Sequence, residues 1–226
     1  MKKIIIACFI LSFLPVAAKN AAVGLRYDFR HPQQIRTNWE FHGAVLLVPK
    51  TGFRVARIGS AEDQMALIVE ANSSSGVLMT APKVDLRKYP VLRWKWRVIR
   101  PMQIAANTPN EPDDQVAVVY LGDGTMIKQK CIGYRWEHHT RIGTVRNLKY
   151  ASGMMHVSAL CIRNKNTKPG EWVVEERNIV QDFFDAYGRF PGNYFVLGIG
   201  ANSQYSKSNT RVEIDYIEFV AKSDLK

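Results

Sequence analysis

The strongest constraint on the fold is a two-residue alternation of apolar and polar side chains that recurs along most of the chain. It is clearest over residues 91–98 (VLRWKWRV), where the even-numbered positions are apolar and Arg93, Lys95 and Arg97 stand between them. Only an extended strand turns alternate side chains to opposite faces. We therefore expect a strand with its tryptophans in a core and its three cations on the other face.

The same period predicts strands along the rest of the chain. They are expected at 53–58, 65–71, 77–81, 116–121, 126–136, 156–163, 172–177, 194–201 and 211–220. In the last of these, the apolar positions change parity between Tyr216 and Ile217, which predicts a β-bulge.

One segment has helical periodicity instead. Residues 179–187 carry an apolar stripe, Asn178 can cap their start, and Gly188 is expected to end the helix. We expect this helix to pack through Phe183 and Phe184. About ten strands with one short helix predict an all-β fold, an antiparallel two-sheet β-sandwich of the jelly-roll, galactose-binding-like kind.

The start of the chain predicts export. Lys2 and Lys3 precede an apolar run that ends at Val16, and small residues follow at 17–18. This is the order of a secretory signal peptide, and the run is too short to span a bilayer stably. We expect residues 1–18 to be removed and residues 19–226 to form a single periplasmic or secreted domain without a transmembrane segment. The sequence leaves its oligomeric state open.

Two cysteines remain after removal of the leader, in a compartment that permits disulfides. The predicted strands 126–136 and 156–163 can pair antiparallel with Cys131 opposite Cys161, which would bring the two within disulfide reach. The alternative is that both are unpaired thiols serving as small apolar side chains.

The chain is basic. Its 31 Lys+Arg fall to 29 once Lys2 and Lys3 are removed, against 20 Asp+Glu. Outside the cytoplasm, anionic glycans and other envelope polymers are the expected acidic neighbours, and nucleic acid is not. The alternative is that the charge serves only solubility.

The first candidate for a ligand-binding face is the row Arg93, Lys95 and Arg97. Arg135, in the predicted strand 126–136, is a further candidate, and Tyr205 is a candidate aromatic residue that could stack on the ligand. Like charges about 7 Å apart repel unless an anionic ligand or neighbouring acids compensate them. We expect few acidic neighbours if the row binds ligand. The alternative is that carboxylates such as Glu213 and Asp215 pair with it.

Catalysis by paired carboxylates would need two facing acids in one site. The candidate acids are Asp113, Asp114, Glu175, Glu176, Glu213 and Asp215. Adjacent strand residues diverge, which separates Glu175 from Glu176 and also His138 from His139. Asp113-Asp114 can be read as calcium ligands or as the start of a strand. We assign no catalytic residue, no metal ligand and no cofactor.

Several motifs together resemble the uncharacterised secreted bacterial family called domain of unknown function 3047. They are the run 85–98 (DLRKYPVLRWKWRV), Asp113-Asp114, Tyr134-x-Trp136, the stretch 170–180 (GEWVVEERNIV), Asp182-Phe183 and Tyr187-Gly188, in the family's order from about Trp39 to Phe219. The family implies secretion and no assigned activity. Similar members carry an acidic loop before the final strand. Here residues 202–210 contain a lysine and no acid, so we expect any site in that loop to be altered or lost.

These observations predict a non-catalytic extracytoplasmic protein that binds a glycan or another envelope ligand, anionic or not, on a sheet face. The alternative is an enzyme that acts on an envelope polysaccharide through paired carboxylates.

Overall fold

The computed structural model describes residues 22–33, 35, 39–43, 47–59, 64–104, 113–125, 128–192 and 194–222. The predicted signal peptide lies outside these residues. Within them, no helix combines the length and apolar character needed to cross a bilayer.

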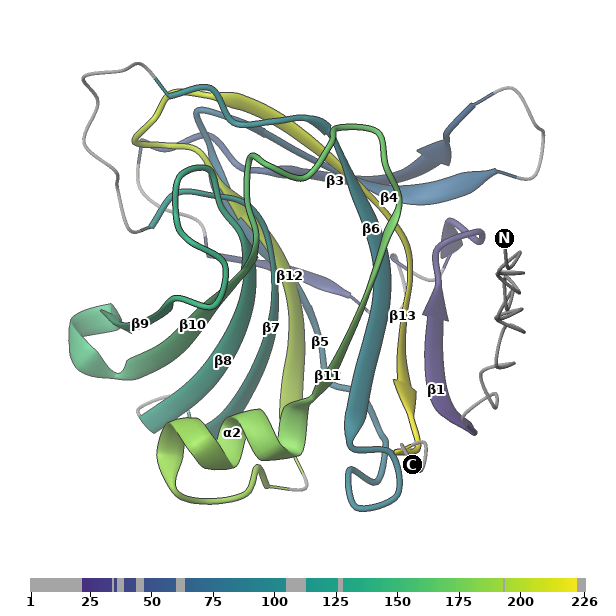
Figure 1. Cartoon of the computed structure of the whole chain (residues 1–226), viewed down its shortest axis with the longest axis vertical. Coiled ribbons are helices and arrows are strands. Elements are labelled where there is room, and N and C mark those ends of the chain that lie inside the picture. Colours follow the sequence, from purple (N-terminus) through teal and green to yellow (C-terminus); the bar gives the residue numbers. More distant parts are fainter. Residues whose placement is uncertain are drawn as a thin grey trace, which may run out of the picture.

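The described residues form two β-sheets that pack face to face, as predicted (Figure 1). The first sheet has six strands in the order β11 (Val173–Asn178), β6 (Val91–Arg100), β13 (Asn209–Val220), β4 (Met65–Asn72) and β3 (Gly52–Arg57), and β1 (Val23–Asp28) also pairs with β13. The second has seven, in the order β2 (Glu40–His42), β5 (Ser75–Thr80), β12 (Phe195–Asn202), β7 (Gln115–Thr125), β8 (Lys128–Trp136), β10 (Met155–Arg163) and β9 (Val145–Tyr150).

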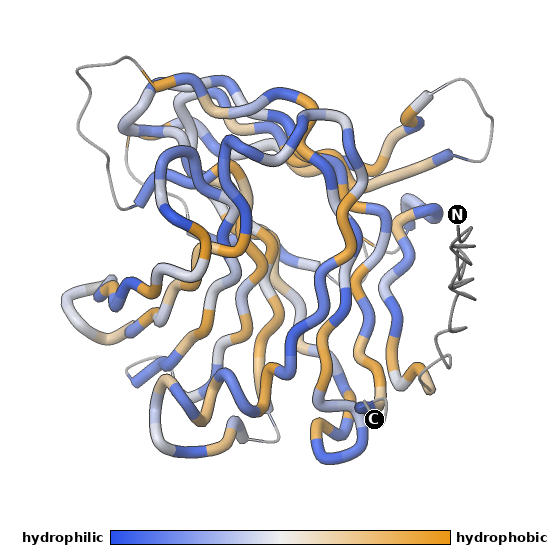
Figure 2. Tube along the Cα trace, in the orientation of Figure 1, coloured by the Kyte–Doolittle hydropathy of each residue, from blue (hydrophilic) through white to orange (hydrophobic). Residues whose placement is uncertain are grey.

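The core lies between the sheets, and its largest members are the tryptophans of β6. Trp94 and Trp96 are fully buried. The Trp94 ring lies 5.4 Å from that of Tyr134, and the Trp96 ring lies 5.4 Å from that of Trp136, both on β8 of the opposite sheet. Along the strands, hydrophobic and hydrophilic residues alternate (Figure 2). The predicted burial of the β6 tryptophans is confirmed.

The predicted bulge in the last strand is also confirmed. The pairing of β13 with β6 shifts register between Ile214 and Tyr216. At the same place the other neighbour of β13 changes, from β4 up to Ile214 to β1 from Tyr216 onward. The carbonyl of Asp215 accepts a hydrogen bond from the backbone N–H of Phe29 at 3.2 Å, just past the end of β1. The bulge thus joins β1 to the sheet.

Helix α2 (Ile179–Tyr187) follows β11 as predicted. The Asn178 side chain accepts from the backbone N–H of Gln181 at 3.1 Å, and Gly188 ends the helix in a left-handed conformation with φ of 66°. Phe183 is buried in the core, but Phe184 is 40% exposed and stacks on Phe190. The expected packing therefore holds for Phe183 and is wrong for Phe184.

A charged contact joins the two sheets beside β11. The Glu175 carboxylate accepts two hydrogen bonds from the guanidinium of Arg163, at 2.6 and 3.1 Å, and one from the Trp96 indole at 3.2 Å. Arg163 comes from β10 of the second sheet and Trp96 from the core. Glu175 is 8% exposed, so these three bonds replace most of its hydration.

The predicted opposition of the cysteines is wrong. β10 runs parallel to β8, and its register places Val157 beside Cys131 and Arg135 beside Cys161. The cause is β9, an edge strand that was not predicted and that lies between β8 and β10 in the chain. β10 returns from this edge antiparallel to β9, so it enters the sheet parallel to β8. Four residues separate the two positions, about 13 Å, which exceeds disulfide reach. Both cysteines are buried free thiols.

We predict that the protein starting at Lys19 carries two thiols that react only on unfolding. Burial raises the pKa of Cys131 to about 12 and that of Cys161 to about 11, so little thiolate forms near pH 8. Iodoacetamide should leave the native protein unmodified and alkylate both cysteines in denaturant without reductant, as measured by intact mass. A mass two hydrogens lower with no alkylation would show a disulfide and contradict this structure.

We also predict that Glu175→Gln lowers the free energy of unfolding by about 1.5 kcal/mol, because Arg163 loses its charged partner. Glu176→Gln is the matched control. Its side chain is 49% exposed and reaches only Arg93 at 3.8 Å, so the cost should stay below about 0.5 kcal/mol. Urea denaturation measures the free energy of unfolding of both variants. Equal losses in the two would mean that the Glu175–Arg163 contact adds no more stability than an exposed ion pair.

Candidate functional site

The basic row of β6 lies on the outer face of the first sheet, and each cation is paired. Arg93 contacts Glu218 at 2.7 Å, Lys95 contacts Asp215 at 2.9 Å, and Arg97 contacts Glu213 at 2.7 Å. All three acids belong to β13. The register of β6 and β13 sets Arg93 opposite Glu218 and Arg97 opposite Glu213. The expectation of few acidic neighbours is therefore wrong, and the ion-paired alternative describes the row.

Two of these acids are nearly buried, and the row supplies charged partners in place of water. The side chains of Glu213 and Glu218 are only 4% and 3% exposed. Each also has a second arginine partner, Arg211 at 2.8 Å for Glu213 and Arg26 at 2.8 Å for Glu218. A nearly buried carboxylate is stable only when it is paired and hydrogen-bonded. Arg93 and Arg97 therefore help to hold the sheet together.

A cavity of about 540 Å³ opens on this face, which we call the basic cavity. Among the residues that the structure describes, four cations and one carboxylate, Asp215, line it. The full lining is Arg26, Arg30, Ile58, Gln64, Met65, Lys95, Arg97, Trp172 and Asp215. Four of these residues come from β1, β13 and β6, which lie side by side in Figure 1. Two members of the predicted row, Lys95 and Arg97, thus reach a concave surface.

Trp172 gives the basic cavity an aromatic wall. It directly precedes β11 and packs on the small apolar cluster formed by Ile58, Ala66 and Ile68. Its ring centroid lies 4.5 Å from the guanidinium carbon of Arg97 and 5.0 Å from the ammonium of Lys95. These are cation–π distances, so the ring and the two cations hold one another in place.

Arg30 stands at the rim, on the side of the cavity formed by the end of β1. Its Nε donates to Asp28 at 2.8 Å, and this hydrogen bonding lowers the pKa of Asp28 to about 2. Arg30 remains 58% exposed despite this contact. The side chain of Asp28 is only 16% exposed, so a ligand at the rim must compete with this carboxylate for Arg30.

The other predicted site residues lie elsewhere. Arg93 is on the same face but does not line the cavity. Arg135 is on β8 of the second sheet, 1% exposed, in a salt bridge with Glu137 at 3.2 Å, so no ligand on the first sheet reaches it. Tyr205 lies 48% exposed on the turn before β13, whose backbone N–H groups at 205 and 206 bond to Asp114 at 3.3 and 2.6 Å. The acid-free loop 202–210 is thus held by a carboxylate from outside it.

Sequence reasoning missed Arg26, Arg30 and Trp172 as members of the site. Arg26 and Arg30 enter it only because β1 joins β13 past the bulge. Trp172 belongs to the motif at residues 170–180, but nothing in the sequence indicated that its side chain would lie over β6 rather than in the core.

The structure also bears on catalysis and metal binding. Each of the six candidate acids has a partner: Asp113 accepts from the Tyr150 hydroxyl at 2.7 Å, Asp114 holds the 202–210 loop, and the other four are paired as described above. Among the described residues, no three His, Cys, Asp or Glu side chains are grouped as a metal site.

Solved structures of similar architecture share little sequence with this chain. The family 11 carbohydrate-binding module of the cellulase Lic26A-Cel5E of Clostridium thermocellum is 8% identical, with 84% of this chain and 91% of that chain covered and a TM-score of 0.41. The K1 cleaved adhesin domain of Lys-gingipain of Porphyromonas gingivalis W83 is 11% identical, with 89% and 100% covered and a TM-score of 0.43. Scores below 0.5 say nothing about what this chain binds. No curated protein matches the sequence.

A family model covers most of the chain. It is described as "Protein of unknown function (DUF3047)" and matches residues 38–218. These residues include β6, Trp172 and the part of β13 that supplies Asp215, and the motifs that carried the resemblance contribute Lys95, Arg97 and Trp172 to the cavity. The chain belongs to the family DUF3047.

Proposed function

We propose that this protein is a non-catalytic binding protein that acts outside the cytoplasm and recognises an anionic glycan in the basic cavity. The observation that carries the proposal is the lining itself: Arg26, Arg30, Lys95 and Arg97 surround a space of about 540 Å³ with Trp172 as its wall, and Asp215 is the one carboxylate that the described part of the chain adds to the lining. The predicted signal peptide at residues 1–18 supports the location.

The size and chemistry of the cavity suit a short stretch of polymer. Ligand sites of about 300–1,000 Å³ bury most of a small ligand, so 540 Å³ has room for a few sugar rings. Guanidinium groups bind carboxylates and sulfates with two parallel hydrogen bonds, and Arg97 and Arg30 can present such groups. Trp172 is half-buried and adds an aromatic surface to the cavity wall.

The existing ion pairs determine how tightly we expect a ligand to bind. Every cation that lines the cavity already has a carboxylate partner, so a ligand must compete with those acids. Lys95 and Asp215 are 31% and 26% exposed, which makes their pair easy to exchange. We therefore expect moderate affinity that falls as salt rises, because salt screens exposed charges.

We predict that the protein starting at Lys19 binds oligogalacturonate more tightly than the uncharged maltohexaose in isothermal titration calorimetry. Lys95→Gln and Arg30→Gln should each weaken oligogalacturonate binding by about ten-fold, or about 1.4 kcal/mol, and flatten its salt dependence. Lys95→Gln should change thermal stability little, whereas Arg30→Gln should lower it, because the 16% exposed Asp28 loses its main partner. Arg87→Gln is the matched control, because it removes one charge at an 88% exposed position whose ion pair is with Asp85, outside the cavity lining. Equal loss in all three variants, or no preference over maltohexaose, would refute the proposal.

Arg97→Gln separates binding from stability. It should weaken binding and also lower the free energy of unfolding by about 1–2 kcal/mol, because Glu213 then keeps only Arg211. Urea denaturation measures this change beside that of Lys95→Gln. If Lys95→Gln destabilises as much as Arg97→Gln, the whole row is structural and the ligand must bind elsewhere.

A further inference from the structure

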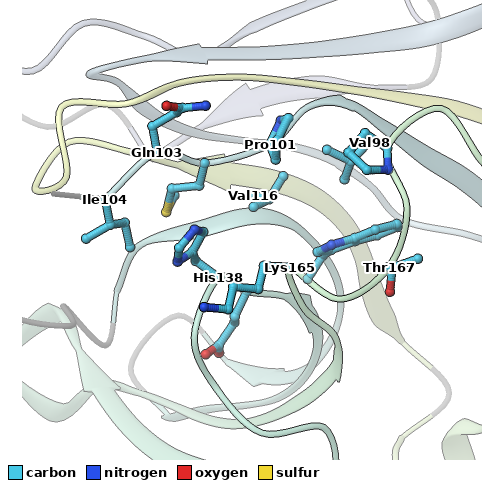
Figure 3. Close-up of a pocket in the computed structure, with 12 residues that line it drawn as sticks. Val98, Pro101, Gln103, Ile104, Val116, His138, Lys165 and Thr167 are labelled. Atoms are coloured by element: carbon cyan, nitrogen blue, oxygen red, sulfur yellow. The ribbon is translucent and has the colours of Figure 1, made fainter. Parts of the chain in front are cut away.

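A second pocket lies at the end of the sandwich, between the sheets, where β6 leaves the first sheet and β7 begins in the second. We call it the end pocket. Its volume is about 260 Å³, and its apolar lining includes Val98, Pro101, Val116 and Trp136. Figure 3 shows His138 and Lys165 on the opposite side of it from Pro101 and Val98. Val98 directly follows Arg97, so adjacent residues of β6 line the two cavities on opposite faces of the sheet.

His138, which lines the end pocket, has a buried polar atom whose hydrogen bonding is unsatisfied. The Nδ1 atom of His138 is buried and has no hydrogen-bond partner in the part of the chain that the structure describes. Burial, followed by the charges of His139 and Lys165, lowers the pKa of His138, so its ring is neutral at pH 7. A neutral imidazole with its proton on Nε2 can accept a hydrogen bond at Nδ1. Buried polar atoms without partners are uncommon, and a ligand hydroxyl would satisfy this one.

The end pocket also has a cation that is not neutralised. The ammonium of Lys165 lies 3.3 Å from Nδ1 of His139, and within the described residues no carboxylate pairs with it. The basic cavity differs here, since each of its four cations has an acidic partner. Glu137 also lines the end pocket, but its carboxylate is engaged by Arg135 at 3.2 Å. The charge that the pocket offers to a ligand is therefore positive.

We propose that the end pocket binds a single anionic sugar ring, a hexuronate residue. Its apolar C–H face would lie against the half-buried Pro101 and Ile104, one hydroxyl would donate to His138 Nδ1, and its carboxylate would pair with Lys165. The volume fits one ring, since larger ligands need pockets above about 300 Å³. The choice of sugar class rests on the proposed function, but the site is separate from the basic cavity and is tested separately.

The experiment titrates methyl β-D-glucuronoside into the protein starting at Lys19 and follows the methyl NMR signals of Val98 and Val116. We expect saturable shifts of both, and at least several-fold weaker binding of methyl β-D-glucoside, which lacks the carboxylate. Lys165→Gln should weaken glucuronoside binding about ten-fold, and His138→Phe should weaken both sugars. Lys165 is exposed, so its substitution leaves the fold intact even if His138→Phe does not.

Lys95→Gln is the control, because Lys95 lines only the basic cavity. Unchanged glucuronoside binding in Lys95→Gln, with loss in Lys165→Gln, supports the end pocket even if oligogalacturonate does not use the basic cavity. No saturable shift of Val98 and Val116, or equal binding by Lys165→Gln and the unaltered protein, overturns the inference and leaves the proposal for the basic cavity standing.

Discussion

The alternation of side chains along β6 is the constraint on which the rest of this structure depends. Burying Trp94 and Trp96 between the sheets forces Arg93, Lys95 and Arg97 onto the outer face, because successive strand residues point to opposite sides. Three cations in a row repel one another unless acids stand beside them. The strand next to β6 supplies these acids, and its register with β6 brings Glu218 and Glu213 opposite the two arginines. The core and the charged face are thus two consequences of one pattern.

The bulge at Asp215 turns this face into a cavity. It shifts β13 against β6, places the Asp215 carboxylate 2.9 Å from Lys95, and lets β1 take over from β4 as the neighbour of β13. Arg26 and Arg30 arrive with β1, and Trp172 covers the opposite side. A regular strand would leave a flat lattice of ion pairs. With the bulge, the same lattice has a hollow whose described lining holds four cations and one carboxylate, while each cation keeps its acidic partner.

Much of the fold could be predicted from the sequence, because period-two patterning is a strong local signal. It located the core strands, the capped helix and the bulge to within a few residues. It failed where the outcome depends on distant partners. β9 contains exposed apolar residues such as Val145, which is 55% exposed, so its alternation is weak and did not predict a strand. This edge strand is what makes β10 parallel to β8. The disulfide prediction failed for that reason alone.

The site was predictable only in part, for a similar reason. Lys95 and Arg97 could be chosen from their own strand, but no local pattern shows that Arg30 and Trp172 lie beside them. Arg135 has the same alternation as the basic row, yet it is buried on the other sheet with Glu137 as its partner. Which face of a strand is open is decided by what packs on it, and one strand does not contain that information.

The most direct test of the central claim, that the basic cavity holds an anionic glycan, is a crystal structure of this protein with an oligogalacturonate. The ligand should lie against Trp172, with a carboxylate within hydrogen-bond distance of Arg97 or Arg30 and the Lys95–Asp215 contact lengthened from its present 2.9 Å. A ligand bound on the outer face of the second sheet, with the basic cavity unchanged, would contradict the claim.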